Sequence, residues 1–353
     1  MRIVFIDSWP ADVRLGSGTA TAIAGLRGGL VALGHEVVTL RPRGAPRGSL
    51  TVHRLLFNLA VPRHLNALRA DLIVGFDIDG FLWARRRRTQ PYVVALKGVA
   101  AEERQHERGQ PRRLLGVLAW LEGGNARHAD GVVTTSRYLR DAIVRHYSVT
   151  PERLRIVPEG IDLARWRGPA PASGDGRTVL CVARQYPRKH VADLLRALPM
   201  VRRVVPEARA VIVGDGPEHA ALRRVAAQLE LGGAVTFRGA VDDATLLSCY
   251  RSADVYCLPS VQEGFGIVFL EAMASGLPIV ATSAAAVPEV VPPDAGILVP
   301  PGNVEALAEA LAALLEAPAR RRELGEAGQR AVRAYDWPLV ARRFLEELQR
   351  PAD

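Results

Sequence analysis

The stretch from Asp254 to Ser283, "DVYCLPSVQEGFGIVFLEAMASGLPIVATS", contains one complete strand-helix-strand unit. Its two ends, "DVYCLPS" and "LPIVATS", are short apolar runs that are typical of buried strands. Between them we predict a helix from about Ile267 to Ser275, because Gly266 stands before it and Gly276 directly after it. Such a unit joins two parallel strands of one sheet.

The same alternation continues along the chain in both directions. The other expected strands are "RIVFID", "EVVTLRP", "ADLIVGF", "YVVALKG" and "DGVVTTS" in the first half, and "TVLCVAR", "ARAVIVG" and "AVTFRG" in the second. Helical patterns such as "TAIAGLRGGLVALGH" and "EHAALRRVAAQLEL" separate them. This order predicts an α/β fold of two successive doubly wound parallel sheets, with ligands at the carboxyl ends of the strands.

The length of 353 residues also favours two domains, because single hydrophobic cores stop growing at about 250 to 300 residues. The Pro- and Gly-rich stretch "WRGPAPASGDG" at 166–176 shows no hydrophobic periodicity and is interpreted as a linker. We expect one Rossmann-like domain over 1–168, a second over 169–332, and a C-terminal helix within 333–353 that returns to the N-terminal domain.

The net charge of +9 is unevenly distributed. Residues 1–170 carry 26 Lys and Arg against 15 Asp and Glu, whereas residues 171–353 carry 20 against 22. A basic first half suits an anionic substrate or an anionic membrane surface. We expect no nucleic-acid partner, since the sequence has no helix-turn-helix, zinc-finger or RNP pattern.

One segment of the first half, residues 103–122, combines basic and apolar character. Its sequence, "ERQHERGQPRRLLGVLAWLE", begins with arginines and continues with leucines and a tryptophan. As a helix it could lie on an anionic membrane, which suits a lipid-linked acceptor. A packed helix with a solvated basic start is the alternative.

The cysteines and the N-terminus bear on the compartment. Cys181, Cys249 and Cys257 have neither metal-ligand nor CxxC spacing, so neither a disulfide framework nor a zinc site is expected. The chain opens directly with a short strand and contains no run of 18 apolar residues. These features predict a cytoplasmic protein, with peripheral contact at the inner face of the membrane as a further option.

The two glutamates of the opening stretch, Glu263 and Glu271, are eight residues apart. Eight helical residues rise about 12 Å, whereas the two carboxyls of a glycosidase lie roughly 5 to 9.5 Å apart. They therefore suit the two ends of one long ligand. Gly264 and Gly266 permit close backbone approach, and the helix N-terminus after them favours an anion or a hydroxyl. The alternative is a glycine-rich turn with surface acids.

Two cations follow the first predicted strand of the second half. Arg184 and Lys189 in "VARQYPRKHVADLLRAL" lie at the carboxyl end of that strand and directly before a helix. This position predicts a diphosphate clamp. A solvated helix start is the alternative.

Two further motifs are weaker. "VIVGDGPEH" has His219 where a dinucleotide fingerprint requires its third glycine, so an ordinary strand-to-helix turn is favoured. "FDID" offers Asp77 and Asp79, but two carboxylates alone are a weak signal for a metal ion. Solvated turn acids or acceptor-binding groups are favoured there, and no metal site is predicted.

Together these motifs resemble those of the family-four retaining glycosyltransferases, also called glycosyl transferases group 1. The stretch "EGFGIVFLEAMASGLPIVAT" is similar to the E-x7-E signature of that family, and "TSRYLRD", "RIVPEGID", "VARQYPRK", "VIVGDGP" and "AGILVPPGNVEALAEAL" extend the likeness along the chain. The resemblance implies a GT-B fold, in which two Rossmann-like domains face each other across a cleft, and a role in polysaccharide or glycoconjugate synthesis.

The resemblance also implies roles for single residues. Glu263 would bind hydroxyls of the donor sugar and Glu271 those of the ribose, while Arg184 and Lys189 would neutralise the departing diphosphate. The other implied donor contacts are Gly264, the amides of Phe265, Gly266 and Ile267, the backbone of Val241 beside the base, and Gly18 in a loop over the phosphates.

Three positions depart from the family pattern. Lys97 stands where histidine is usual, Glu159 where asparagine is usual, and "SAAAVPEV" where two glycines are usual before Pro-Glu. Lys97 and Asp79 are assigned to the acceptor or sugar side of the site. Lys97 could contact an acidic sugar, an acceptor or a phosphate oxygen, or serve stability alone.

The resulting hypothesis is transfer of a sugar from a nucleotide-diphosphate sugar to an acceptor hydroxyl, with retained configuration and without metal or cofactor. The acceptor is expected to be a sugar, a lipid-linked compound or a small molecule. The alternatives are a nucleotide-sugar epimerase or hydrolase, a non-catalytic nucleotide-sugar-binding subunit, and a metal-dependent enzyme that uses Asp77 and Asp79.

Overall fold

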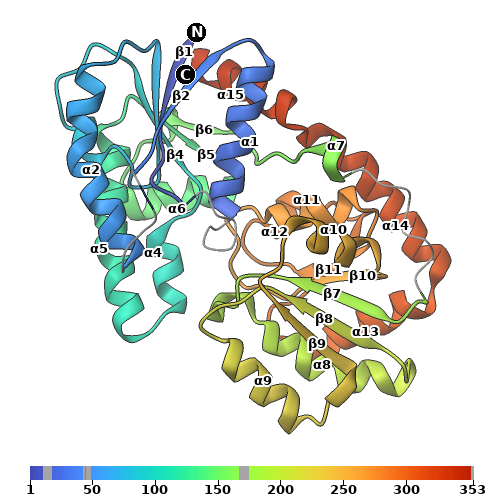
Figure 1. Cartoon of the computed structure of the whole chain (residues 1–353). Helices are drawn as coiled ribbons and strands as arrows, with labels where there is room; N and C mark the ends of the chain where they lie inside the picture. Colours follow the sequence, from blue (N-terminus) through green and yellow to red (C-terminus); the bar gives the residue numbers. More distant parts are fainter. Residues whose placement is uncertain (11–17, 43, 45–48, 167–174, 351–353) are drawn as a thin grey trace. The chain divides into compact units, whose positions relative to one another are not determined.

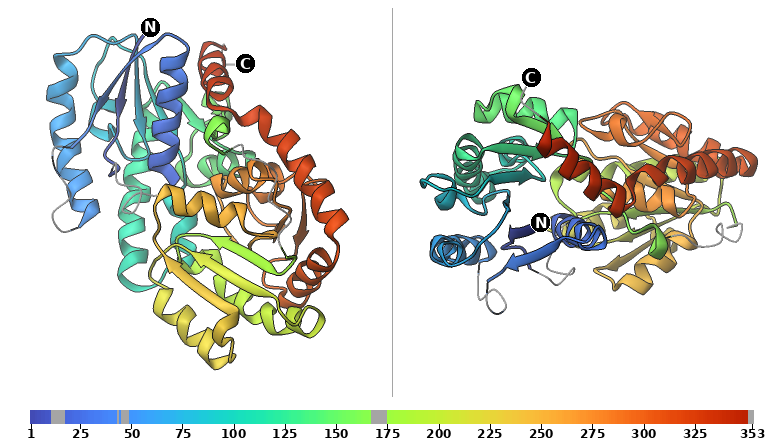
Figure 2. Two further views of the ribbon diagram at one scale, coloured as in Figure 1. Left: turned by 45° about the vertical axis from the view of Figure 1, so that its right-hand side comes forward. Right: turned by 90° about the horizontal axis from the view of Figure 1, so that it is seen from above.

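The computed structural model of the chain describes residues 1–10, 18–42, 44, 49–166 and 175–350 (Figure 1). The chain folds into two compact units. The first unit combines Met1–Gly160 with Trp337–Asp353, and the second is Ile161–Asp336. Each unit contains one parallel six-stranded sheet with helices packed against it (Figure 2).

The first unit is built on strands β1 (Arg2–Ile6), β2 (Glu36–Leu40), β3 (Leu72–Phe76), β4 (Tyr92–Leu96), β5 (Gly131–Thr134) and β6 (Leu154–Ile156), in the order β2-β1-β3-β4-β5-β6. Every residue of β3 and β4 is buried, as in a parallel sheet covered on both faces. The helices are α1 (Gly18–Ala32), α2 (Leu50–Asn66), α3 (Phe81–Ala84), α4 (Ala100–Glu103), α5 (Gly109–His128), α6 (Arg137–Tyr147) and α15 (Trp337–Gln349).

The second unit repeats this plan. Its strands are β7 (Thr178–Val182), β8 (Arg209–Val213), β9 (Val235–Gly239), β10 (Val255–Leu258), β11 (Ile279–Thr282) and β12 (Gly296–Val299), in the order β12-β11-β10-β7-β8-β9. Its helices are α7 (Leu163–Trp166), α8 (Val191–Val204), α9 (His219–Gln228), α10 (Asp243–Arg251), α11 (Ile267–Ala274), α12 (Val287–Val290), α13 (Val304–Glu316) and α14 (Pro318–Ala331).

The predicted strands are all present, and the predicted helix of the opening stretch is α11. Gly276 follows this helix with φ +73°, the left-handed conformation that ends many helices. Strands β6 and β12 were not predicted, and neither were several helices, α2 and α6 among them. β6 has three residues, β12 begins at a glycine, and α2 contains Pro62, so none of the three carries a strong local signal.

The chain passes between the units at Gly160 and at Asp336, not at the predicted boundaries 168/169 and 332/333. The reason is burial, because Ile161, Leu163 and Trp166 belong to the core of the second unit. The Trp166 ring packs edge-on against Tyr250, with 5.1 Å between centroids. Trp166 is therefore a core residue rather than part of a linker, and residues 167–174 of the predicted linker lie outside the described residues.

Helix α15 belongs to the first unit and packs against α1. The indole of Trp337 fills a recess over α1, because a Cβ at Gly25 would lie only 2.0 Å from its ring. A Cβ at Gly160 would lie 2.5 Å from the same ring. The two glycines therefore make room for the tryptophan.

The strand order identifies where each sheet can hold a ligand. In the first unit the direction of winding reverses between β1 and β3, and in the second between β7 and β10. Ligands of doubly wound sheets bind outside the carboxyl ends of the strands at such a switch point. Ligand-binding residues are therefore expected in the loops after β1 and β3 and in those after β7 and β10.

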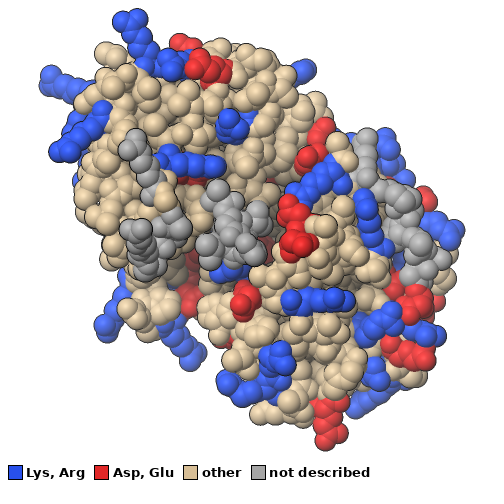
Figure 3. Space-filling view, viewed as in Figure 1, with Lys and Arg blue, Asp and Glu red and all other residues tan. Residues whose placement is uncertain are grey.

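Two helices of the first unit each carry three large exposed apolar side chains. On α5 these are Leu114, Val117 and Trp120, and on α2 they are Val52, Leu56 and Leu59. Lys and Arg side chains are spread over both units on the face shown in Figure 3. Among the described helices, none combines the length and the apolar character needed to cross a membrane.

Candidate active site

An ion pair lies at the switch point of the second unit. Lys189 ends the short turn Pro187–Lys189 after β7, and Glu263 lies in the loop after β10. The Nζ of Lys189 is 2.6 Å from Oε1 of Glu263, and the two side chains are 16% and 7% exposed. Because the pair is largely removed from water, its charges interact more strongly than on an open surface. A role for each residue was predicted from the sequence, but their contact with each other was not.

Gly266 shapes the entry into α11. Its φ of +93° lies in the left-handed region, and a Cβ would lie 2.6 Å from the Phe269 ring. Both facts require glycine at this position.

The backbone carbonyl of Glu263 accepts a hydrogen bond from the amide of Ala286, at 3.3 Å.

The segment that lacks the two usual glycines keeps a glycine-like backbone. Ala285 has φ +52°, a conformation that L side chains rarely adopt. Together with the hydrogen bond from Ala286 to the Glu263 loop, this places the start of α12 against that loop. Ala285 thus holds a backbone conformation that is strained for an alanine.

Glu271 lies within α11 and has its own partner. The hydroxyl of Tyr250 donates a hydrogen bond to its Oε2 at 2.8 Å. Burial raises the pKa of Glu271 to about 7, while the hydrogen bond from Tyr250 and the charge of Arg165 lower it. Arg165 itself pairs with Asp243 at 2.9 Å. Tyr250 and Arg165 are polar neighbours of the predicted ribose end that the sequence analysis did not identify.

The other predicted donor residues lie around the same sheet edge. Arg184 is the second residue after β7 and is partly buried. Its guanidinium lies 6.0 Å from the centre of the Tyr186 ring. Val241 lies between β9 and α10 and packs against the core of the unit. Gly264 and Ile267 are partly buried, whereas Phe265, which lies between Gly264 and Gly266, is buried.

Gln185 is a buried residue that sequence reasoning missed. Its Nε2 donates to the carbonyl of Gly214 at 2.8 Å, and its Oε1 lies 2.8 Å from Nδ1 of His219. A Cβ at Gly216 would lie 2.7 Å from the backbone of Gln185. The turn "GDGPEH" is thus packed against the segment after β7. A Cβ at Gly214 would lie 2.1 Å from the carbonyl oxygen of Ala183, so both glycines of the turn are explained by packing and neither requires a bound dinucleotide.

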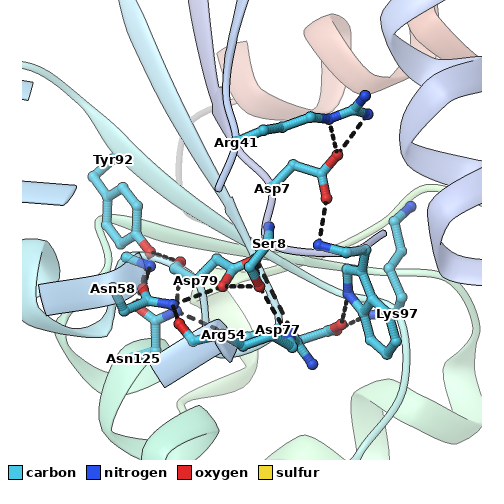
Figure 4. A network of polar contacts seen from close by, with 12 residues as sticks. Asp7, Ser8, Arg41, Arg54, Asn58, Asp77, Asp79, Tyr92, Lys97 and Asn125 are labelled. Atoms are coloured by element: carbon cyan, nitrogen blue, oxygen red, sulfur yellow. Dashed lines mark hydrogen bonds and ion pairs between the residues drawn. The ribbon is translucent and has the colours of Figure 1, made fainter. Parts of the chain in front are cut away.

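The first unit has a buried polar network at its own switch point (Figure 4). Asp79 is fully buried and accepts hydrogen bonds from Ser8 N at 2.8 Å and from Asn58 Nδ2 at 2.8 Å. Burial raises the pKa of Asp79 to about 6, while Arg54 lowers it. These contacts connect the loop after β1 to the loop after β3, so the carboxylate of Asp79 has a structural task.

Asp77 lies beside Asp79 in an unusual conformation. Its φ of +55° is rare for a residue other than glycine. Its carboxylate accepts from Trp9 Nε1 at 3.2 Å and from the amide of Lys97 at 2.9 Å. Within the part of the chain that the structure describes, no group of three or more His, Cys, Asp or Glu is arranged to hold a metal ion.

Two of the three departures from the family pattern contact each other. Nζ of Lys97 lies 3.0 Å from Oε1 and 3.1 Å from Oε2 of Glu159. Their side chains are 8% and 5% exposed. Lys97 follows β4 and Glu159 follows β6, so the sheet brings together two residues that are 62 positions apart.

Gly18, predicted to close over the phosphates, is the first residue of α1 and is exposed. The residues directly before it, 11–17, lie outside the described residues. Its predicted contact with phosphates stays a prediction.

This architecture of two doubly wound parallel sheets is that of the GT-B glycosyltransferases. The structure matches sucrose-phosphate synthase from Thermosynechococcus elongatus with a TM-score of 0.83 at 24% identity, over 98% of this chain and 97% of that one. It matches WaaG, a glycosyltransferase involved in lipopolysaccharide biosynthesis, with a TM-score of 0.76 at 19% identity, over 98% and 99%. At these identities the likeness establishes the fold alone.

Two family models match consecutive parts of the chain. "Glycosyltransferase Family 4" matches residues 16–165, and "Glycosyl transferases group 1" matches residues 164–331. The chain belongs to this family of glycosyltransferases, and the predicted fold and family are confirmed.

Several mycobacterial relatives share part of the chain. A GDP-mannose-dependent alpha-(1-6)-phosphatidylinositol monomannoside mannosyltransferase of Mycobacterium tuberculosis is 34% identical over 62% of this chain and 62% of its own length. A phosphatidyl-myo-inositol mannosyltransferase of Mycobacterium leprae is 42% identical over 48% and 46%. An MMP alpha-(1->4)-mannosyltransferase of Mycolicibacterium hassiacum is 34% identical over 61% and 53%. The matches span roughly half of each relative.

Proposed function

We propose that the chain moves a sugar from a nucleotide-diphosphate sugar to an acceptor hydroxyl, with retained configuration and without a metal ion. The observation that carries the proposal is the Lys189–Glu263 pair, which lies at the switch point of the second unit. Glu263 stands four residues before Ile267, the first residue of α11. In this proposal the second unit binds the donor, and the first unit binds the acceptor.

Departure of the nucleoside diphosphate is the step that most needs assistance, because negative charge develops on its bridging oxygen. Lys189 and Arg184 supply positive charge that is in place before the reaction, and the N-terminus of α11 adds its dipole. The bond from the sugar C1 to the phosphate oxygen breaks, and the acceptor oxygen attacks C1 from the same face. The leaving phosphate takes the acceptor proton, so no protein nucleophile is required.

GDP-mannose is the proposed donor, because the relatives are named mannosyltransferases and one is named as GDP-mannose-dependent. A thermal-shift screen tests this, since a ligand that binds only the native state raises the melting temperature. GDP and GDP-mannose are expected to raise Tm more than UDP, ADP and their sugars do. Equal shifts for all nucleotides contradict the assignment of the base.

The mechanism is tested by NMR of the product formed from the α-linked donor. Retention predicts an α-linked product, and a β-linked product contradicts it. Release of free sugar or an epimerised donor without acceptor supports the hydrolase or epimerase alternative. Tight donor binding without any turnover supports a non-catalytic binding subunit.

A lipid-linked acceptor at an anionic membrane surface is the proposed acceptor class, since two relatives are named for phosphatidylinositol. The first half of α5 fits such a surface. Leu114, Val117 and Trp120 are 40%, 51% and 61% exposed and, at this spacing, lie on one side of the helix next to the exposed Arg112 and Arg113.

Flotation with vesicles tests this contact. The chain is expected to float with phosphatidylglycerol vesicles and much less with phosphatidylcholine vesicles at moderate salt. Trp120→Ser should reduce flotation, whereas Val204→Ser, at a 50% exposed apolar position of the second unit, should not. Absence of flotation at any composition, or equal loss for both variants, contradicts the membrane contact.

A further inference from the structure

A single residue with a left-handed backbone separates Lys189 from helix α8. His190 has φ +49°, whereas Pro187–Lys189 form a helical turn on one side of it and α8 begins at Val191 on the other. Residues other than glycine rarely adopt this conformation, and they keep it only where contacts in the folded chain stabilise it. His190 therefore interrupts what would otherwise be one continuous helix over 187–204.

The local sequence gives no reason for this interruption. Proline is favoured at the first position of a helix, and a helix that began at Pro187 would run on to Pro199 without meeting a glycine. In such a helix Lys189 would lie one turn before Asp193, since side chains four residues apart are neighbours. Because a left-handed residue breaks the helical path, the turn Pro187–Lys189 does not continue the axis of α8.

The imidazole of His190 has a partner that fixes this conformation. Its Nδ1 lies 2.9 Å from Oδ2 of Asp193 in the first turn of α8, and the amide of Asp193 donates to the carbonyl of His190 at 2.9 Å. The side chain of Asp193 is 8% exposed, and Arg196 donates to its other oxygen at 2.8 Å. A partly exposed ring is thus held by a buried carboxylate that is itself fixed from within α8.

The turn is also joined to the loop that carries Glu263. The carbonyl of Arg188 accepts a hydrogen bond from the amide of Val261 at 2.9 Å and another from the hydroxyl of Ser260 at 3.2 Å. Nζ of Lys189 then reaches Oε1 of Glu263 at 2.6 Å. All three contacts require the turn to leave α8 in the direction of the loop after β10.

We infer that His190 is a positioning residue for the proposed reaction. Its left-handed backbone, fixed by the contact of the imidazole with Asp193, directs the ammonium group of Lys189 to Glu263 and so to the place where the charge of the diphosphate develops. His190 itself acts only through Lys189. The inference rests on the proposed function, in which Lys189 assists departure of the diphosphate.

The first test measures the position of Lys189 without any transfer reaction. Lys97 and Lys189 are the only lysines in the sequence, so acetylation by an N-hydroxysuccinimide ester, followed by mass spectrometry, reports on two side chains. His190→Ala is expected to raise the acetylation rate of Lys189 by about fivefold or more, because alanine resists the left-handed conformation and Lys189 then loses Glu263. The rate at Lys97, which is 8% exposed, should stay unchanged. An equal rise at both lysines reports general loosening of the chain and overturns the inference.

The second test separates the backbone conformation from the side chain. Glycine and asparagine tolerate a φ of +49°, whereas alanine resists it. His190→Gly and His190→Asn should therefore keep kcat within a few-fold of wild type. His190→Ala should lower kcat by about tenfold or more, with a smaller change in the KM for the donor. Equal losses of kcat in the alanine and glycine variants overturn the inference, because kcat then does not depend on the backbone conformation.

Glu230 provides a matched control in the same unit. It has φ +53°, is exposed, and follows α9 shortly before β9 begins, whereas Lys189 follows the carboxyl end of β7. Glu230→Ala should lower Tm about as much as His190→Ala does, without a change in kcat or in acetylation of Lys189. Should His190→Ala fail to fold, Asp193→Asn removes the charge that anchors the imidazole and should raise acetylation of Lys189 alone.

Failure of this inference and failure of the proposed function give different results. Unchanged acetylation of Lys189 and unchanged kcat in folded His190→Ala overturn the inference and leave the diphosphate clamp in place. A wild-type chain that is inactive with every nucleotide sugar contradicts the proposed function instead. In that case acetylation still tests whether His190 positions Lys189, and equal rates in wild type and His190→Ala overturn that role.

Discussion

The Nζ of Lys189 lies 2.6 Å from Oε1 of Glu263, so the cation predicted beside the diphosphate is held by the carboxylate predicted beside the sugar. The two groups come from loops after neighbouring strands, β7 and β10. A substitution of either residue therefore removes the ion-pair partner of the other and alters its position. Effects of single substitutions at this pair should not be additive.

Lys189→Ala is expected to lower kcat by on the order of 10²–10³-fold, because it removes a preorganised charge that acts mainly in the transition state. The variant also leaves Glu263 without its cation, so Tm should fall. Steady-state kinetics at saturating donor measure the first effect and calorimetry the second. Lys189→Arg, which keeps the charge, should retain more activity than Lys189→Ala, and alanine kinetics within a few-fold of wild type contradict the clamp.

Stability should depend on pH through Glu271, whose pKa burial raises from 4.5 to about 7. The native state holds this proton more tightly than the unfolded chain does. The contribution of Glu271 to the free energy of unfolding is therefore complete below about pH 4.5 and is lost as the pH rises through about 7. The loss is on the order of 3 kcal/mol at most.

Urea unfolding of wild type and Glu271→Gln at pH 4.5, 6 and 8 measures this contribution. The variant should lose less stability than wild type over that range, since glutamine does not ionise. Glu309→Gln, at an exposed position of α13, should follow the wild-type curve. If the free energy of unfolding changes with pH by the same amount in wild type and Glu271→Gln, the prediction is contradicted.

Gly25 and Gly28 lie on the same helix, α1, and should respond oppositely to alanine. A Cβ at Gly25 would lie 2.0 Å from the Trp337 ring, whereas a Cβ at Gly28 meets nothing within 4 Å. Gly25→Ala should destabilise the chain by about 1–3 kcal/mol through overpacking. Gly28→Ala should stabilise it by about 0.5–1 kcal/mol, because alanine is the better helix former. Denaturant unfolding measures both, and equal effects refute the packing account.

The transfer rate is expected to be unchanged by EDTA. Arg184 and Lys189 are proposed to supply the charge that a metal ion supplies in other glycosyltransferases. The carboxylates of Asp77 and Asp79 are engaged by Trp9, Lys97, Ser8 and Asn58. Loss of activity with EDTA, restored by Mg²⁺ or Mn²⁺, supports the metal-dependent alternative instead.

Local patterns in the sequence were enough to predict the two doubly wound sheets, the position of α11, and the loops in which the candidate site lies. These follow from local signals, namely apolar runs, helical periodicity, and glycines such as Gly266 and Gly276 that suit only certain backbone conformations. The same local signals were too weak for β6, β12 and α2. They also placed the domain boundary too late, since the burial of Trp166 against Tyr250 is not a local property.

Which side chains contact each other could not be predicted in this way, because it depends on how the strands are arranged in the sheet. Lys97 and Glu159, noted separately as departures from the family pattern, form one ion pair across 62 positions of sequence, and Lys189 and Glu263 form another across 74. Such contacts depend on strand order, because parallel strands bring their carboxyl ends to one edge whatever their separation in the chain. The strand order therefore brings Lys97 and Glu159, two departures from the family pattern, together as one ion pair at the carboxyl ends of the strands.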